Sequence, residues 1–373
     1  MTLVRPAVAE RPFVPELQLL RAIGCLLVFV AHSAIIFYPY LFSPTIGKPF
    51  GEYVARAVVG FFILSGVAMA YPYVTGSKRF KSATFYFERF VRLYPAYAVA
   101  TVFALGMRFV TTHWFVLSPT SPWPQKFWGQ PLTTSALIEN FAPLILLERT
   151  INPAYWTLSL EIQACLFFPF VLLLVRRKDW RWCAAVVAAL TIASHYYPYL
   201  LVIRTVSYLL LGACVAKYNQ QIKAKLEKIT KPVAVLMCVA VAGFFWLAPA
   251  LTTVYRLSFL LFDCGLALLM VVVQVWSPTV SLAQFKPVQK MGDLSYCFYL
   301  LHLPVLSFAV FAVLPVVKSA PLVIAAAFTA TLAVSIVLHR YVEQPLRRIA
   351  KARQSQLNRG PSLDVDVARE ASA

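Results

Sequence analysis

The chain has 373 residues, of which 60% are apolar and 13% charged, and its mean hydropathy is +0.71. This composition excludes an ordinary soluble domain and indicates an integral membrane protein. The net charge of +19 does not indicate a nucleic-acid partner, because no nucleic-acid-binding motif accompanies it and the basic residues cluster between apolar runs.

Ten apolar runs follow one another, each near the roughly 20 residues that a membrane-spanning helix needs. The predicted fold is therefore an all-α integral membrane protein with about ten transmembrane helices around a central cavity. The sequence does not fix the boundary between the fifth and sixth runs, since only Pro198 and Tyr199 separate them. The runs cover residues 17–38, 53–73, 90–110, 155–175, 182–197, 200–217, 233–250, 254–276, 294–313 and 322–341.

Lysine and arginine are distributed unevenly between the predicted loops. With the N-terminus in the cytoplasm, the inner segments hold 24 of these residues and the outer loops hold five. Because cytoplasmic loops carry the excess of positive charge, both termini are predicted to be cytoplasmic. The domain prediction is an N-terminal segment at 1–15, a ten-helix membrane domain at 16–348 with an outer loop at 111–154, and a disordered cytoplasmic tail at 349–373.

The first apolar run carries an arginine and a histidine, Arg21 and His32. Eleven helical steps return His32 to within roughly 20° of the azimuth of Arg21 and place it about 16 Å further along the axis. Ionisable groups within hydrocarbon are expensive unless they face a cavity or a partner, so each one is a functional-site hypothesis. We expect the remaining helices to build a cavity around this face.

A carboxylate in the fourth run is predicted to meet this histidine. His32 lies roughly 22 Å from the inner start of its run, and Glu161 lies about 9 Å from the outer end of its own run. In a hydrocarbon layer of about 30 Å the two depths agree. A carboxylate on one ring nitrogen would leave the other nitrogen as a base, so His32 and Glu161 form a predicted dyad for deprotonating an alcohol.

Three arginines, Arg21, Arg89 and Arg92, are expected at the inner side of the membrane. The rigid guanidinium fork suits phosphate, so the three side chains could hold an anionic cytosolic ligand. The alternative is that they are ordinary arginines at inner helix ends, which extend toward the interface and obey the topology rule.

Several other polar or aromatic residues have two readings each. His302 is either a hydrogen-bonded core group or part of a site, and Ser65 and Gly66 either let a ligand or helix approach closely or serve simple helix packing. The aromatic residues of the outer loop, among them Trp123 and Trp128, form either a lid that stacks on sugar rings or, as we favour, an interfacial belt with a surface helix.

The seven cysteines contain no CxxC pair, and P-loop, HExxH, GxSxG and zinc-ligand spacings are not found. We therefore expect small buried thiols, no metal site and no ATP-driven chemistry.

Six stretches follow one another along nearly the whole chain: the R-x10-H spacing of Arg21 and His32, FFILSG at 61–66, RFVRLYP at 89–95, WTLSLEIQ at 156–163, LSYCFYLLHLPV at 294–305 and EQP at 343–345. Together they resemble the membrane-bound acyltransferase-3 family. The residues before Arg21 depart from that family, which more often has Asp-Gly-Leu-Arg-Gly there.

This resemblance implies a multi-pass enzyme of the inner (plasma) membrane. It would transfer an acyl group, usually acetyl, from cytosolic acyl-CoA to a hydroxyl of an extracytoplasmic or lipid-linked carbohydrate. Acetyl-CoA would be a co-substrate, no cofactor would be bound, and the partners would be the lipid bilayer, a carbohydrate or glycolipid acceptor and polysaccharide-assembly proteins, with no nucleic acid.

The same resemblance implies roles for individual residues. Arg21, Arg89 and Arg92 would contact the phosphates of CoA. His32 would be a general base or a transient acyl carrier, supported by Glu161. The candidate supporting residues in the matching stretches are Ser65, Trp156, Ser159, Tyr299 and His302.

Two other functions agree with the same composition. A proton-coupled secondary transporter also places Arg, His and Glu within helices, but it predicts an internal hydropathy repeat, which is not seen. If the protein were a non-catalytic partner of a polysaccharide synthase, the six stretches would have no function.

Overall fold

The computed structural model describes residues 14–41, 48–117, 122–144, 151–197, 201–226 and 281–359, together with short pieces between 228 and 273. The predicted spans at 233–250 and 254–276 lie almost wholly outside these residues. The helices are α1 (Val14–Leu41), α2 (Lys48–Val74), α3 (Ser82–Trp114), α4 (Pro122–Trp128), α5 (Thr134–Phe141), α6 (Tyr155–Leu166), α7 (Phe168–Arg177), α8 (Trp180–Tyr196), α9 (Leu201–Leu226), α13 (Lys286–Phe308), η1 (Ala309–Val313), α14 (Leu314–Val317), α15 (Ala320–Leu338), η2 (His339–Glu343) and α16 (Gln344–Arg359).

The prediction of an all-α, multi-pass architecture is confirmed for the described part of the chain, which contains helices and connecting turns only. Five helical stretches are long and apolar enough to cross a membrane, and the bent pair α6–α7 would make a sixth. The count of ten spans and the cytoplasmic termini remain predictions. The five stretches are Pro15–Leu41, Ser82–Trp114, Leu201–Lys225, Lys286–Val317 and Ala320–Ala350.

The fourth predicted span is broken rather than straight. The axes of α6 and α7 differ by 55° across Phe167. Pro169 stands at the start of α7, and a proline at this position lacks an N–H and crowds the carbonyl four residues earlier, that of Cys165. The bend directs α7 along α2 and α9.

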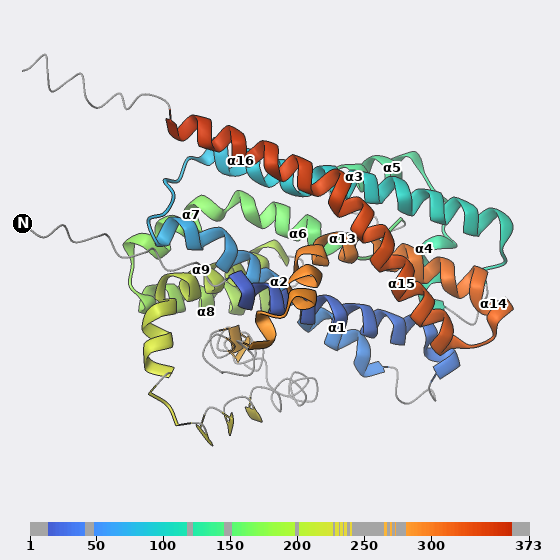
Figure 1. The fold of residues 1–373 in the computed structure, drawn as a ribbon, viewed down its shortest axis with the longest axis horizontal. Helices are drawn as coiled ribbons and strands as arrows, with labels where there is room; N and C mark the ends of the chain where they lie inside the picture. The colour runs from blue at the N-terminus through green and yellow to red at the C-terminus, as the bar shows by residue number, and fades with distance from the viewer. Residues whose placement is uncertain are drawn as a thin grey trace, which may run out of the picture.

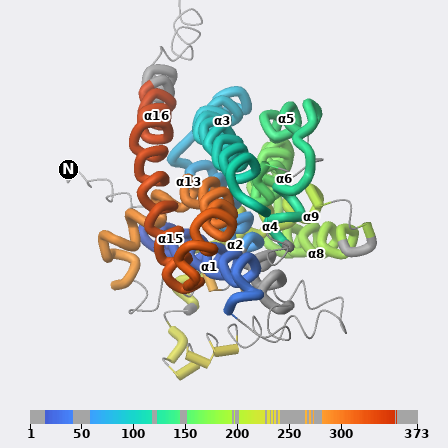
Figure 2. The backbone as a smooth tube through the Cα atoms, turned by 90° about the vertical axis from the view of Figure 1, so that its right-hand side faces the viewer, coloured from blue at the N-terminus to red at the C-terminus, as the bar shows by residue number. Residues whose placement is uncertain are grey.

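Helix α13 lies in the middle of the bundle and packs against α1, α3 and α15 (Figures 1 and 2). Contacts near both ends, between Gln18 and Asp293 and between His32 and His302, show that α1 and α13 run in the same direction. Contacts of Ser65 and Met69 with Glu161 and Cys165 show the same for α2 and α6. An alternating topology requires these directions for the first and ninth spans and for the second and fourth.

The C-terminal boundary of the predicted membrane domain differs from expectation. Helix α16 continues to Arg359, so the prediction of a disordered tail from residue 349 is wrong for 349–359, while 360–373 lie outside the described residues. Within the predicted outer loop, the chain forms the short helices α4 and α5.

Helices α2 and α9 approach closely through two glycines. A Cβ atom added at Gly66 would lie 2.4 Å from the carbonyl oxygen of Leu209, and one added at Gly212 would lie 2.1 Å from that of Ile63. Small residues at a membrane helix crossing let backbones touch, which maximises dispersion contacts where no hydrophobic effect drives association. The packing reading of this stretch is therefore confirmed for Gly66.

We predict that Gly66→Ala destabilises the protein, because the new methyl group meets backbone that cannot move aside; overpacking typically costs about 1–3 kcal/mol. Thermal unfolding of the purified protein in detergent would show a lower Tm. Gly60→Ala is the matched control on the same helix, since nothing lies within 4 Å of its added Cβ. Equal Tm values for the two variants would contradict the close approach of α2 and α9 at Gly66.

Candidate functional site

A cavity of about 70 Å³ lies where the beginnings of α1, α3 and α13 meet η2 and α16. We call it the arginine cavity. Its size suits one small anionic group, since pockets for whole drug-sized ligands measure roughly 300–1,000 Å³. It is lined by Arg21, Ser65, Arg89, Arg92, Leu93, Glu161, Gly292, Asp293, Ser295, Tyr296, Glu343 and Arg347.

The three carboxylates of the arginine cavity already have partners. Glu161 accepts a hydrogen bond from the hydroxyl of Ser65 at 2.7 Å, and Asp293 accepts one from the side-chain amide of Gln18 at 2.6 Å. Glu343 forms a salt bridge with Arg347 at 3.4 Å. The carboxylates are thus held by groups other than the three predicted arginines.

Arg21, Arg89 and Arg92 all line this cavity, as expected of three arginines from the inner side. Across the described residues, none of the three guanidinium groups forms a salt bridge within 4.0 Å. Guanidinium groups that face a cavity and form no salt bridge can hold an anionic group, because charge-assisted hydrogen bonds to phosphate or carboxylate are the strong ones. The phosphate-binding role of the three arginines stays a prediction.

Glu343 is fixed by three neighbours besides its place on the cavity wall. Its Oε2 accepts hydrogen bonds from Nδ1 of His339 at 2.7 Å and from the thiol of Cys297 at 3.1 Å. The ligand atoms of these three residues lie within 4.8 Å of one another, a spacing that a metal ion could use. Because Arg347 also contacts this carboxylate and would repel a cation, we assign the group to positioning Glu343 instead.

Two histidines meet at the other end of the α1–α13 contact. Nε2 of His302 lies 3.1 Å from Nδ1 of His32, and the ring centroids are 5.0 Å apart. Both side chains are buried, with exposed fractions of 7% for His32 and 1% for His302. We call these two residues the histidine pair.

Backbone carbonyls define which nitrogens of the histidine pair carry hydrogen. Nδ1 of His302 lies 2.7 Å from the carbonyl of Tyr299, which can only accept, so this nitrogen donates and Nε2 of the neutral ring is the acceptor. Nδ1 of His32 lies 3.0 Å from the carbonyl of Val28 and therefore donates as well. In the neutral form of His32 the lone pair therefore lies on Nε2, which can act as a base.

The surroundings of the histidine pair are aromatic. The ring of Trp123 of α4 is tilted against the ring of His32, with centroids 5.7 Å apart. The ring centroid of Tyr299 lies 5.5 Å from that of His302. The hydroxyls of Tyr299 and Thr157 are hydrogen bonded at 2.6 Å. Trp128 is only 2% exposed, so the favoured reading of the outer-loop tryptophans as an interfacial belt is wrong for Trp128.

The predicted pairing of His32 with Glu161 is wrong. Glu161 lines the arginine cavity with Arg21, while the nitrogen contacts of His32 go to Val28 and His302. The depth estimate assumed that α6 begins at the membrane surface. Instead, residues 151–155 are buried and Asn152 hydrogen bonds to the carbonyl of Leu300, so α6 starts inside the bundle and carries Glu161 deeper.

The remaining candidates separate into two groups. His302 belongs to the histidine pair, Tyr299 lies beside it, and Ser65 lines the arginine cavity. Trp156 packs against the core of α2, α7 and α9, and Ser159 donates to the carbonyl of Pro143, so the structure brings neither to the histidine pair or the cavity lining.

The sequence analysis overlooked three charged residues that line cavities. Asp293 and Arg347 belong to the arginine cavity, and Arg108 lines a second cavity near the other end of α3. An arginine inside the apolar run 90–110 was a signal in itself, because intramembrane charge marks a site by default.

Comparison with known proteins places these features in a family. The model of a family described as an acyltransferase domain matches residues 14–340. The chain is 32% identical over 142 residues to acyltransferase MdmB of Streptomyces mycarofaciens, covering 36% of this chain and 34% of that protein. The chain thus matches about a third of the length of this curated relative. No solved structure matches it significantly.

We predict that Glu343→Gln lowers the free energy of unfolding by about 3 kcal/mol, the lower end for breaking a buried pair, because Arg347 is itself 32% exposed. The loss leaves one guanidinium without its counter-charge. Glu88→Gln is the control, since its ion pair with Lys78 is 20–24% exposed and worth at most about 1 kcal/mol. Thermal unfolding in detergent compares the two, and a Tm loss no larger for Glu343→Gln would exclude this role.

Proposed function

The chain belongs to the acyltransferase-3 family, and on that premise we propose that it is a membrane O-acyltransferase. It moves an acyl group, most simply acetyl, from cytosolic acyl-CoA to a hydroxyl group. The proposed acceptor is a carbohydrate or glycolipid on the extracytoplasmic side of the inner membrane. Its helices that can span a membrane and the placement of the arginine cavity support this assignment.

One observation carries the proposal: helix α1 carries, in line along its axis, an arginine that lines a cavity and a buried histidine that contacts a second histidine. Arg21 lines the arginine cavity and His32 belongs to the histidine pair, about 16 Å along the same helix. A CoA thioester has the same layout, with phosphates at one end and the reactive carbonyl at the end of a long flexible arm. We propose that one phosphate group of CoA binds at the guanidinium groups of Arg21, Arg89 and Arg92, with the thioester beside His32.

The proposed reaction is a direct transfer. Nε2 of His32 takes the proton of the acceptor hydroxyl as its oxygen attacks the thioester carbonyl carbon. The C–S bond then breaks, and the sulfur leaves as the CoA thiol after receiving the proton from the imidazolium. His302 stabilises the imidazolium by accepting the hydrogen bond from Nδ1 of His32, so it is a positioning residue.

The buried location of the histidine pair supports transfer over hydrolysis. His302 is almost fully enclosed, and Phe29, Phe298 and Trp123 provide apolar walls nearby. A site without water protects an activated thioester from hydrolysis and strengthens the electrostatic interactions within it. The acceptor hydroxyl is then the proposed nucleophile that reaches His32.

We predict that His32→Ala lowers acyl transfer at least about 100-fold, because a positioned general base contributes roughly 10²–10⁴. Membrane vesicles with acyl-CoA available to the cytoplasmic face would be assayed for released CoA and for radiolabelled acetyl in carbohydrate. The control is Leu27→Ala on the exposed face of α1, which should leave the rate unchanged.

The His302 variants sharpen this test. His302→Gln keeps an acceptor for the hydrogen bond from His32 and should recover part of the rate that His302→Leu loses, with the KM for acyl-CoA unchanged in both. Activity of His32→Ala near that of the unaltered protein would overturn the base assignment, whereas no CoA release by any version would overturn the enzymatic proposal.

We predict that Arg21→Gln raises the KM for acetyl-CoA about 10- to 100-fold, the worth of a charge-assisted hydrogen bond. Acetyl-pantetheine, which lacks the phosphates, should be used equally well by both proteins. Arg79→Gln is the control, since this exposed arginine lies outside the cavity lining. An equal loss with both donors would show that Arg21 supports the fold rather than the phosphates.

A further inference from the structure

Tyr299 of α13 lies between the arginine cavity and the histidine pair. It follows Ser295, which lines the cavity, by four residues and precedes His302 by three, about 6 Å and about 4.5 Å along the helix axis. Residues at these spacings project from one side of a helix. A donor molecule that extends from the cavity to the histidine pair, as proposed above, therefore passes Tyr299.

Side chains of α2 and α6 meet Tyr299 at this level. The ring centroid of Phe61 of α2 lies 6.3 Å from that of Tyr299, and the hydroxyl of Thr157 of α6 lies 2.6 Å from the hydroxyl of Tyr299. Phe61 and Thr157 each stand four residues, one helical turn, before a residue that lines the arginine cavity, Ser65 and Glu161 respectively. We call Phe61, Thr157 and Tyr299 the middle layer.

The ring of Phe61 packs against α1 and closes the middle layer on that side. A Cβ atom added at Gly24 would lie 3.0 Å from Cζ of Phe61, so this glycine leaves room for the ring. A donor arm that reaches the histidine pair has to displace the ring, and rotation about the side-chain bonds can do this without a change in the backbone. Between α1 and α2, a side chain rather than backbone therefore closes the path.

The hydroxyl of Tyr299 can exchange its hydrogen-bond partner. The carbonyl of Ala154 has three donors within reach, namely the hydroxyl of Thr157 at 3.0 Å, the hydroxyl of Tyr299 at 3.1 Å and the backbone N–H of Thr157 at 3.3 Å. A carbonyl oxygen has two lone pairs, so the two donors of Thr157 are sufficient for it. The hydroxyl of Tyr299 can therefore turn toward a ligand without leaving this buried acceptor unpaired.

The flexible arm of an acyl-CoA carries a group that fits this hydroxyl. Two methylene groups separate the thioester sulfur from the nearest amide of the arm. With the thioester beside the histidine pair, this amide lies about one helical turn back toward the arginine cavity, at the level of Tyr299. Because an amide carbonyl in an apolar interior is costly to leave without a donor, the arm needs a hydrogen bond at this level.

We propose that the hydroxyl of Tyr299 binds the carbonyl of this amide and thereby holds the thioester carbon beside His32. This inference rests on the proposed function and adds a binding residue for the donor, Tyr299, and a positioning residue, Thr157. The hydroxyl of Thr157 keeps the carbonyl of Ala154 paired, so that Tyr299 is available to the donor. The ring of Phe61 moves aside as the arm enters.

The test compares two donors with the full chain in membrane vesicles. One is acetyl-pantetheine, and the other is its analogue in which two methylene groups replace the amide nearest the sulfur. Tyr299→Phe should lower kcat/KM for acetyl-pantetheine about three- to tenfold, the worth of one neutral hydrogen bond, and leave that for the analogue unchanged. Tyr86→Phe is the matched control, since its hydroxyl donates to the carbonyl of Leu166 outside the middle layer, and it should change neither value.

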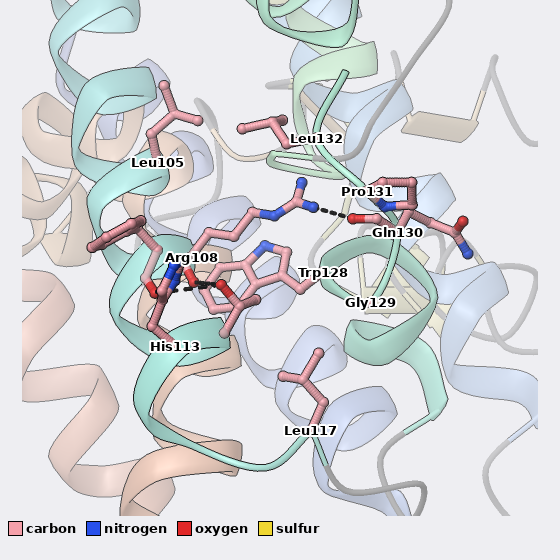
Figure 3. Close-up of a pocket in the computed structure, with 11 residues that line it drawn as sticks. Leu105, Arg108, His113, Leu117, Trp128, Gly129, Gln130, Pro131 and Leu132 are labelled. Carbon is pink, nitrogen blue, oxygen red and sulfur yellow. Dashed lines mark hydrogen bonds between the residues drawn. The ribbon is translucent and has the colours of Figure 1, made fainter. Parts of the chain in front are cut away.

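Thr157 variants test the positioning role. Thr157→Val removes one donor from the shared carbonyl, which then retains the hydroxyl of Tyr299, so the same donor-selective loss is expected. Thr157→Ser keeps the hydroxyl and should restore the rate. Thr112→Val is the matched control, because the hydroxyl of Thr112 donates to the carbonyl of Arg108 at the second cavity, which Figure 3 shows.

An equal loss with both donors would overturn the assignment, because it would show that the hydroxyls only support the fold. Unchanged kcat/KM for acetyl-pantetheine in Tyr299→Phe would overturn it as well. Release of CoA from acetyl-CoA by the unaltered protein is measured first. Absence of this release would overturn the proposed function and this inference with it, whereas release without the donor-selective loss would overturn this inference alone.

Discussion

The cost of placing ionisable side chains among apolar helices governs this structure. A charge in hydrocarbon is expensive unless it is paired or faces a cavity, and the described residues show both solutions. Glu343 is held by Arg347, His339 and Cys297, whereas Arg21 and its neighbouring arginines face a cavity. The two central histidines are paired as well, since Nε2 of His302 lies 3.1 Å from Nδ1 of His32.

The contact between α1 and α13 fixes where the arginine cavity and the histidine pair lie relative to each other. Gly292 lets the two backbones touch, since a Cβ there would lie 2.4 Å from the carbonyl oxygen of Gln18. The thiol of Cys25 lies 3.7 Å from the carbonyl of Ser295 further along. Because both helices run in the same direction, the contact sets the arginine cavity and the histidine pair at fixed positions along one axis.

The segment between α3 and α6 packs against the helix bundle beside the histidine pair. Trp123 touches His32, Trp128 donates to the carbonyl of Ile151, and Asn152 binds the carbonyl of Leu300 on α13. A loop can enter a membrane bundle only where its polar backbone groups find partners, and these side chains supply them. The loop thereby encloses the histidine pair and sets where α6 begins.

The sequence alone determined the class, the family and the face shared by Arg21 and His32, because composition, motif order and the helical repeat are local properties of the chain. It also predicted that Arg21, Arg89 and Arg92 lie at the same end of the helix bundle, because positively charged residues concentrate on the cytoplasmic side. Only the tertiary structure decided that His32 meets His302 rather than Glu161. Counting residues gives depth only if a helix starts at the membrane surface, and the buried residues 151–155 break that condition. Apolar helices also carry little information about their neighbours, so the pairing of α1 with α13 emerged only from packing.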